Sequence, residues 1–293
     1  SVANGKITQL DLMGFMSGDL SQLFELPAGP IAFSLGAEYR RETLRYDLDD
    51  LTQEGYAFYN AIPSFESPSF ASKEVYGEIF VPLLADQPFF ENLSLRGNAR
   101  LADYKGATGS VWAYGGEAVW SPVQDITLRG TYARSVRAPN LSELYSAVGQ
   151  NFAPGFSDPC SERNLATGSA TRVANCNAAG RPAGYDYVYI SSLEILSGGN
   201  EGLNEETADS YTAGVILQPR WIPGLSVSVD YFNIDIKDVI TTIGLQDILS
   251  RCAAGNAALC ARVERDAGGN IVRIVSSYTN LAQYKTDGID LEA

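Results

Sequence analysis

Hydrophobic and polar residues alternate along much of the chain in segments that resemble β-strands in length. The segments span Ile31–Arg41, Glu74–Leu83, Leu93–Tyr104, Val111–Pro122, Asp125–Val136, Ala208–Pro219 and Leu225–Ile236. A period of two places successive side chains on opposite faces of a strand. The pattern therefore predicts an all-β chain, and the segments are long enough to cross a bilayer at a tilt.

Arginine on the polar faces helps to choose between two all-β architectures. Arg96 and Arg100 share one face of the segment Leu93–Tyr104, and Arg129 lies on the polar face of the segment Asp125–Val136. Charged side chains are costly in a packed core but tolerated in a water-filled lumen. The pattern favours an antiparallel transmembrane β-barrel. The alternative is a soluble or cell-surface β-sandwich, a carbohydrate-binding or adhesin module that would dissolve without detergent.

The connections between these segments fall into two classes. Ser121–Gln124 and Pro219–Gly224 are short, and Pro82–Asn92 is somewhat longer, whereas Asn140–Asn204 and Val239–Gln283 are long. Short turns at one end and long loops at the other are typical of outer-membrane barrels. We expect the two long segments to be extracellular loops.

Four motifs, in order, carry a resemblance to a known family. They are SVRAPNLSELY at Ser135–Tyr145, GNEGLNEETADSY at Gly199–Tyr211, LSVSVDYFNIDIKDV at Leu225–Val239 and KTDGIDLEA at Lys285–Ala293. Together they resemble the barrel of TonB-dependent outer-membrane receptors. The second motif departs mildly from the family pattern, with Glu201 and Glu205 where prolines are common and Gly202 where an acidic residue is usual.

The resemblance implies a receptor in the outer membrane of a Gram-negative bacterium. Such a protein imports a bulky, scarce nutrient, an iron–siderophore or an oligosaccharide, by ligand-gated movement of a plug domain. The implied partners are the small-molecule nutrient, the lipid bilayer and, through the plug, the TonB energy-coupling complex. We recognise no plug, no energy-coupling box, no final strands and no signal peptide, so residues 1–293 are expected to form one partial barrel domain.

Composition excludes several other functions. The formal net charge is −14 and the pI about 4.4, which disfavours a nucleic-acid partner. Histidine is absent from the sequence, which excludes His-dependent catalytic triads and His-ligated zinc. Asp47, Asp49 and Asp50 lack the glycine and glutamate of an EF-hand, so we expect no metal site and no cofactor. Glycoside hydrolysis by a carboxylate pair is a remote alternative, and we expect no enzyme.

The four cysteines form two pairs that are local in sequence. Cys160 and Cys176 lie in the first long loop, and Cys252 and Cys260 in the second. Such spacing predicts two loop disulfides in an oxidising compartment. The alternative, a metal held by all four cysteines, would require the tighter C-x2-C spacing.

Two groups of residues are candidate ligand contacts. Arg134, Arg137 and Asn140 could bind an anionic ligand or the plug, because guanidinium groups match carboxylate and phosphate oxygens. Alternatively, they organise the barrel wall by pairing with acidic neighbours, namely Glu143, Glu205 or Glu206.

Tyrosines at alternate positions in the first long loop suggest an aromatic platform. Their alternation would place the rings of Tyr185, Tyr187 and Tyr189 on one face, where they could stack on a sugar ring or an aromatic siderophore. A plain edge strand within the loop is the alternative.

Short ordered elements are also predicted in the loops. Asn140 and Asn204 are candidate N-caps of one-turn helices. Gln246–Gly255 indicates a loop helix, and Asp266–Asn270 a hairpin turn. Trp112, Tyr114 and Trp120 share one strand face, which suggests an aromatic girdle or ordinary core packing.

Overall fold

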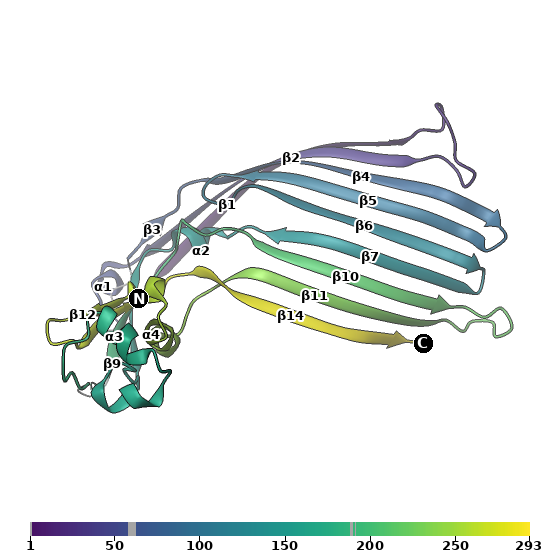
Figure 1. Ribbon diagram of the computed structural model, residues 1–293. Coiled ribbons are helices and arrows are strands. Elements are labelled where there is room, and N and C mark those ends of the chain that lie inside the picture. Colours follow the sequence, from purple (N-terminus) through teal and green to yellow (C-terminus); the bar gives the residue numbers. More distant parts are fainter. Residues whose placement is uncertain (1, 58–62, 188–189, 191) are drawn as a thin grey trace.

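The computed structural model describes residues 2–57, 63–187, 190 and 192–293. Its main element is one large antiparallel sheet in the order β1-β2-β4-β5-β6-β7-β10-β11-β14, with β3 paired to β2 (Figure 1). The strands are β1 Ala3–Asp19, β2 Ala32–Leu48, β3 Phe65–Glu66, β4 Phe70–Gln87, β5 Phe90–Tyr104, β6 Gly109–Val123, β7 Ile126–Arg137, β10 Glu206–Leu217, β11 Val227–Thr241 and β14 Thr279–Glu292. Strands that follow one another in sequence are neighbours in space, and the sheet is curved but not closed.

The strands predicted from alternation are confirmed, and β1 is an addition. The sequence pattern fails at β1 because both of its faces carry apolar residues. Leu12 and Met16 lie on one face, and Met13 and Phe15 on the other, all more than half exposed. The connection Pro82–Asn92 is a turn as expected, but it is shorter than predicted, because β4 and β5 extend until only two residues separate them.

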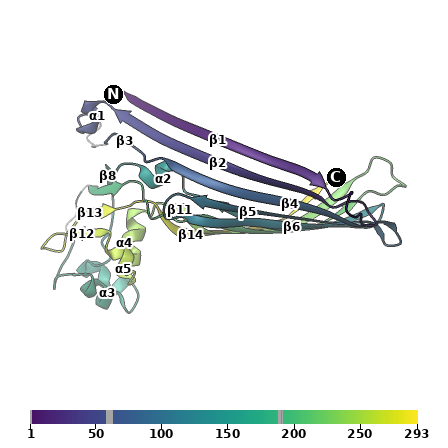
Figure 2. The same ribbon diagram turned by 90° about the horizontal axis from the view of Figure 1, so that it is seen from above.

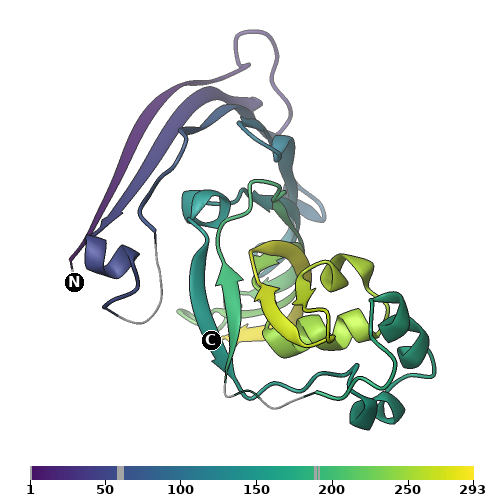
Figure 3. The same cartoon turned by 90° about the vertical axis from the view of Figure 1, so that its left-hand side faces the viewer.

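The register gives the sheet a polar face and an apolar face. Phe70, which precedes the polar-face residue Glu74 on β4 by four positions, packs with Leu141 and Leu144 of helix α2 (Leu141–Tyr145). This short teal helix lies inside the curve of the sheet (Figure 3). The concave face is therefore the polar one, and it also carries Arg96 and Arg129. Its opposite, the convex face, carries apolar and small residues.

The apolar band on the convex face runs obliquely across the strands. At the end nearest the long loops, polar residues begin at Thr8 on β1, Lys73 on β4, Arg134 on β7 and Asp287 on β14. Between β1 and β14 this border moves by ten paired residues over eight strand-to-strand steps. These steps correspond to about 33 Å along the strands and about 38 Å across them, an angle of roughly 40°. Strands tilted by about this angle are characteristic of β-barrels.

The two long loops together form a second, smaller body, which we call the loop unit (residues 149–197 and 242–276). It lies beyond one end of the large sheet, the loop end (Figure 2). It contains a four-stranded sheet in the order β12-β13-β9-β8. Its elements are β8 Gly149–Pro154, η1 Glu162–Thr167, α3 Arg172–Ala178, β9 Ser192–Ser197, α4 Leu245–Ala253, α5 Ala257–Cys260, β12 Val263–Arg265 and β13 Ile271–Val275. A further short helix, α1 (Asp50–Gln53), follows β2.

The loop unit has its own core, to which both loops contribute. Phe156 and Leu193 of the first loop pack with Ile248 and Ile274 of the second, and the last two are fully buried. Parallel pairing of β9 with β13 joins the two loops through backbone hydrogen bonds.

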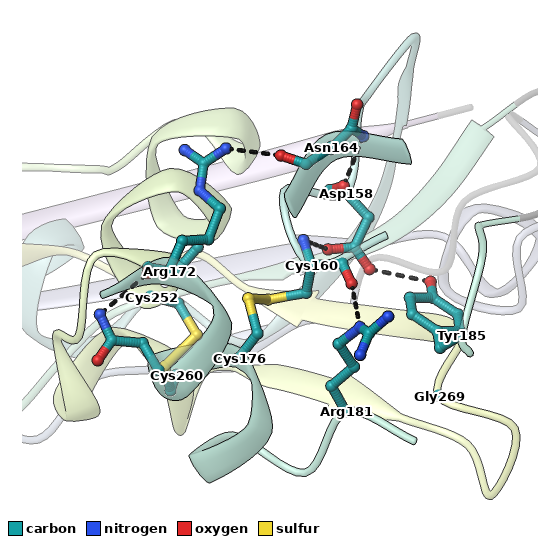
Figure 4. The surroundings of a disulfide bond; sticks show 12 residues. Asp158, Cys160, Asn164, Arg172, Cys176, Arg181, Tyr185, Cys252, Cys260 and Gly269 are labelled. Atoms are coloured by element: carbon teal, nitrogen blue, oxygen red, sulfur yellow. Dashed lines mark hydrogen bonds between the residues drawn. A yellow bond between two sulfur atoms is a disulfide. The ribbon is translucent and has the colours of Figure 1, made fainter. Parts of the chain in front are cut away.

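Both predicted disulfides are present, which excludes a metal site built from four cysteines. Cys160 is bonded to Cys176, and Cys252 to Cys260 (Figure 4). Cys160 and Cys176 pack against Ala253 of α4, so the first disulfide also contacts the second loop.

The predicted short elements are confirmed except for one. Asn140 caps α2, α4 lies where a loop helix was expected, and Asp266–Asn270 turns between β12 and β13. The helix predicted after Asn204 is wrong, because strand β10 begins at Glu206 and pairs on both sides. Asn204 instead exchanges hydrogen bonds with Asn280. In the described part of the chain, no helix is long and apolar enough to cross a membrane.

Removing the first disulfide should destabilise the loop unit but not the large sheet. The double substitution Cys160→Ala and Cys176→Ala should lower the free energy of unfolding of the loop unit by about 3 kcal/mol. The reason is that the disulfide, with a sequence separation of 16, no longer restricts the unfolded chain. Hydrogen exchange should accelerate in α3, β9 and β13, while β4 and β5 keep their protection. Equal acceleration in β4 and β5 would contradict the independence of the two bodies.

Candidate functional site

A network of four charged side chains covers the concave face near the loop end. Arg100 on β5 lies 2.8 Å from Glu38 on β2 and forms a short ion pair with Glu74 on β4. Arg40 lies 3.5 Å from both carboxylates. The side chain of Glu74 is only 1% exposed, and Ser72 donates a further hydrogen bond to it at 2.8 Å. The two arginines and two glutamates balance, so this network is polar and nearly neutral, and Glu42 beside it adds a carboxylate that has no ion pair in the described structure.

Two adjoining pockets lie over this network. One, of about 270 Å³, is bounded by Arg40, Phe70, Tyr104 and the segment 136–140. The other, of about 240 Å³, is bounded by Glu74, Arg100 and Tyr104 among others. Both open on the concave face, where a domain or ligand inside the curve would contact them.

Arg137 and Asn140, two of the predicted contacts, border the larger pocket and have structural partners. Arg137 lies 2.6 Å from Glu206 and 3.0 Å from Glu143. The side-chain oxygen of Asn140 accepts a hydrogen bond from the backbone N–H of Glu143. The Glu143 carboxylate accepts one from the backbone N–H of Asn140. This capping box fixes α2 against the sheet. The pairing alternative for Arg137 is present, and Glu206 is its partner on β10.

Arg134 lies on the other face of the sheet. It faces the convex side beside Tyr114 and Tyr132, and it forms a bidentate pair with Asp209 at 2.8 Å. Side chains three positions apart on a strand point to opposite faces of the sheet. Arg134 and Arg137 therefore cannot contact one ligand together.

The predicted tyrosine platform is not formed by Tyr185 and Tyr187. Tyr185 is 6% exposed, and its hydroxyl donates to Asp158 at 2.9 Å. The ring of Tyr187 packs on Phe156, with centroids 5.1 Å apart. Neither residue lies in a strand, so the edge-strand alternative is also wrong for them, and Tyr189 lies outside the described residues. Tyr185 and Tyr187 thus belong to the core of the loop unit.

A buried ion pair joins the two loops beside Tyr185. Asp158 in the first loop is fully buried and lies 2.6 Å from Arg265 in the second. The guanidinium of Arg265 also lies 5.7 Å from the centre of the Tyr185 ring. Figure 4 shows Asp158 between Cys160 and Tyr185, both of which hydrogen-bond to it. Burial, together with the neighbouring carboxylate, raises the pKa of Tyr185 above its ordinary value.

Four of the seven arginines in the loop unit are ion-paired, whereas Arg172, Arg251 and Arg262 have no carboxylate within 4 Å among the residues that the structure describes. Arg163, Arg181, Arg265 and Arg273 each pair with a carboxylate of the same unit. The respective partners are Asp186, Glu162, Asp158 and Glu194. The Arg163 guanidinium holds the pKa of Asp186 well below its usual range.

A third pocket lies where the loop unit meets the sheet, and we call it the neck pocket. Its volume is about 460 Å³, and hydroxyl, amide and small residues line it: Ser146, Ala147, Gly149, Gln150, Asn151, Ser197, Gly198, Thr242 and Tyr278. None of these side chains is charged. Both loops contribute, which is why no local motif in the sequence indicated the site.

The described residues contain no cluster of three or more carboxylate, cysteine or histidine side chains suited to a metal ion. Each arginine of the concave face pairs with a carboxylate on another strand. The arrangement suits noncovalent binding of polar groups.

Comparison with known proteins identifies what this architecture resembles. A family model described as TonB dependent receptor-like, beta-barrel, matches residues 3–293. A search of curated protein sequences gives no match.

Several solved structures share the fold at low sequence identity. A mutant of the ferric enterobactin receptor PfeA of Pseudomonas aeruginosa, in complex with enterobactin, superposes with a TM-score of 0.62 and 18% identity over 98% of this chain and 33% of its own. The siderophore receptor PirA of the same organism gives 0.58 and 18%, over 98% and 39%. The Serratia marcescens hemophore receptor HasR gives 0.56 and 12%, over 99% and 39%. The chain thus spans a third to two fifths of these proteins.

Alkaline pH should loosen the loop unit through Tyr185. Its raised pKa means that the folded unit keeps the phenol protonated where the unfolded chain ionises, so stability is full below pH 10 and falls as pH rises above it. Hydrogen exchange of β9 and β13 should accelerate above pH 10 beyond the intrinsic effect of base. Tyr185→Phe should remove that excess, and it should lower the free energy of unfolding by about 2 kcal/mol at neutral pH because buried Asp158 loses a hydrogen-bond donor. An unchanged excess in the variant would refute the assignment.

Proposed function

Because the chain belongs to the TonB-dependent receptor β-barrel family, we propose that it forms part of the barrel wall and ligand-binding loops of an outer-membrane receptor. The receptor would import a bulky, scarce nutrient by ligand-gated movement of a plug domain, with the TonB complex supplying energy through the plug. Residues 1–293 would be one partial barrel domain. The expected action is transport without covalent chemistry.

The oblique apolar band is the observation that carries this proposal. Its border crosses nine strands in a nearly straight line, at roughly 40° to the direction of the hydrogen bonds between strands. This is expected when tilted strands cross a flat bilayer. Tyr114, Tyr132 and Tyr211 lie along it, with neighbouring centroids 6.1 and 4.9 Å apart. Aromatic rings at the border of an apolar band are typical of a membrane interface.

The concave face would then line the lumen. Its neutral network around Glu74 and Arg100 leaves both pockets polar, which suits a wall that a plug contacts and releases. A wall with unpaired charge would hold a complementary plug more tightly. When ligand binds at the loop unit and the plug moves, the polar groups of the lumen wall would thus exchange one set of polar contacts for another.

The lining of the neck pocket favours a neutral ligand. It carries no charged side chain, and its polar side chains are hydroxyl and amide groups. These groups suit the hydroxyls of a sugar. We therefore place a neutral oligosaccharide ahead of an anionic iron–siderophore as the imported nutrient. The siderophore alternative is supported by the names of PfeA and PirA, which match this chain in fold only.

Membrane insertion can be tested with two arginine substitutions on β5. Leu95 is 41% exposed on the convex face, and Leu95→Arg should reduce the free energy of unfolding in lipid by about 2–4 kcal/mol. Asn98→Arg is the matched control, because Asn98 faces the lumen opposite Glu78. Equal effects of the two substitutions in the full-length receptor would contradict a lipid-facing convex surface.

The receptor proposal itself depends on where the protein resides. The full-length protein should fractionate with outer membranes and migrate faster on a gel before heating than after. Soluble recovery without such a shift would refute it.

The ligand class can be tested at the neck pocket. Ala147→Phe should fill much of the pocket and weaken binding of a neutral oligosaccharide to the full-length receptor at least tenfold by calorimetry. Val173→Phe, on the exposed face of α3 and 46% exposed before substitution, is the control and should bind as the unaltered protein does. If the receptor binds a ferric siderophore and no oligosaccharide, the iron–siderophore becomes the favoured nutrient.

A further inference from the structure

Basic residues gather on the convex face at the loop end of β1 to β5. They are Lys6, Arg41, Arg45, Lys73 and Lys105, all exposed. Register places them together: Lys6 is opposite Arg45, and two positions back along β2 lies Thr43, followed by Arg41. Lys73 is opposite Tyr39, the next residue on that face of β2. This outer basic cluster is unusual in a chain whose net charge is −14.

Part of this positive charge is not neutralised. Arg45 pairs with Asp47 at 2.7 Å and lies 3.9 Å from Glu66, and Asp103 is opposite Lys73 in the register. The Lys105 ammonium donates to the Ser69 carbonyl at 3.3 Å. Lys6, Arg41 and Lys73 have no carboxylate within 4 Å among the residues that the structure describes. By contrast, Arg40 and Arg100 on the other face, and Arg134 further along the convex face, all form ion pairs.

An apolar groove of about 500 Å³ lies below the cluster on the same face. Small residues form its floor and larger apolar side chains its sides, with contributions from β2, β4, β5 and β6. The residues concerned are Gly77, Gly97 and Ala99, with Phe33, Leu35, Ile79 and Tyr114 around them. Lys73 and Gly77 are on one face of β4, four residues and about 13 Å apart. The groove begins within the apolar band, and the basic cluster lies just beyond its border.

We propose that this surface binds a phosphate-bearing lipid of the outer leaflet. The outer basic cluster would hold the phosphates, and an acyl chain would lie in the groove. Lysine and arginine form strong charge-assisted hydrogen bonds with phosphate oxygens. A soluble anion would satisfy the cluster but leave the groove empty, so the combination favours a lipid. The inference rests on the proposed membrane location of the convex face.

The decisive experiment compares lipid binding by matched variants. The full-length receptor in detergent is titrated with lipid A, with dephosphorylated lipid A and with inorganic phosphate, and complexes are counted by native mass spectrometry. Each basic residue near a membrane surface contributes about fivefold to affinity, so Arg41→Gln with Lys73→Gln should weaken lipid A binding about 25-fold. Arg220→Gln, an exposed arginine in the turn between β10 and β11, should have no effect.

Three outcomes of the comparison between variants and lipids would overturn the inference. They are equal binding of lipid A by the double variant and the unaltered receptor, equal binding of the dephosphorylated lipid, and phosphate binding as tight as that of lipid A. Heat-modifiable migration of each variant shows that it has folded. Loss of lipid binding by the unaltered receptor with that migration intact would reject this inference alone, whereas absence of both would reject the proposed function.

Discussion

The backbone hydrogen-bond ladder between antiparallel strands is the constraint on which the rest of the structure depends. Because pairing runs without a shift across the middle of the large sheet, the side-chain period of two is kept in phase from β1 to β14. A slip of one residue in β5, for example, would turn Arg96 and Arg100 toward the apolar band. The irregularities lie near strand ends, at Pro82, Val123 and Asp238, where they leave the band undisturbed.

The loop unit is stabilised by a different principle. It has an apolar core, two disulfides and the buried Asp158–Arg265 pair. The described part of the sheet has no disulfide, and its apolar cluster around Phe70, Leu141 and Leu144 lies at the loop end. A buried ion pair specifies geometry more than it adds stability, because desolvation offsets most of the attraction. Here it fixes how the two loops meet. The arrangement of the large sheet therefore depends on its surroundings, whereas that of the loop unit depends on its own interior.

Sequence reasoning succeeded where a signal is local. Strand alternation, the capping box at Asn140 and the cysteine spacing each depend on residues close in the chain, and each is confirmed. It failed at β1, where the apolar residues Met13 and Phe15 break the alternation, and at Asn204, where pairing with β7 and β11 overrides a helix cap. The concave network and the neck pocket could not be predicted, because both join residues brought together only by the register and by the docking of two loops. Whether Arg137, Asn140 or the tyrosines contact a ligand stays a prediction.

The parallel pairing of β9 with β13 has a consequence for how such receptors diversify. Strand β9 belongs to the first loop and β13 to the second, about eighty residues later, yet neither completes a sheet without the other. Transplanting one loop into another receptor would expose half of a hydrophobic interior and an unmatched buried charge. The two loops are therefore not separate folding units, and a change in the core of one would have to be matched by a change in the other.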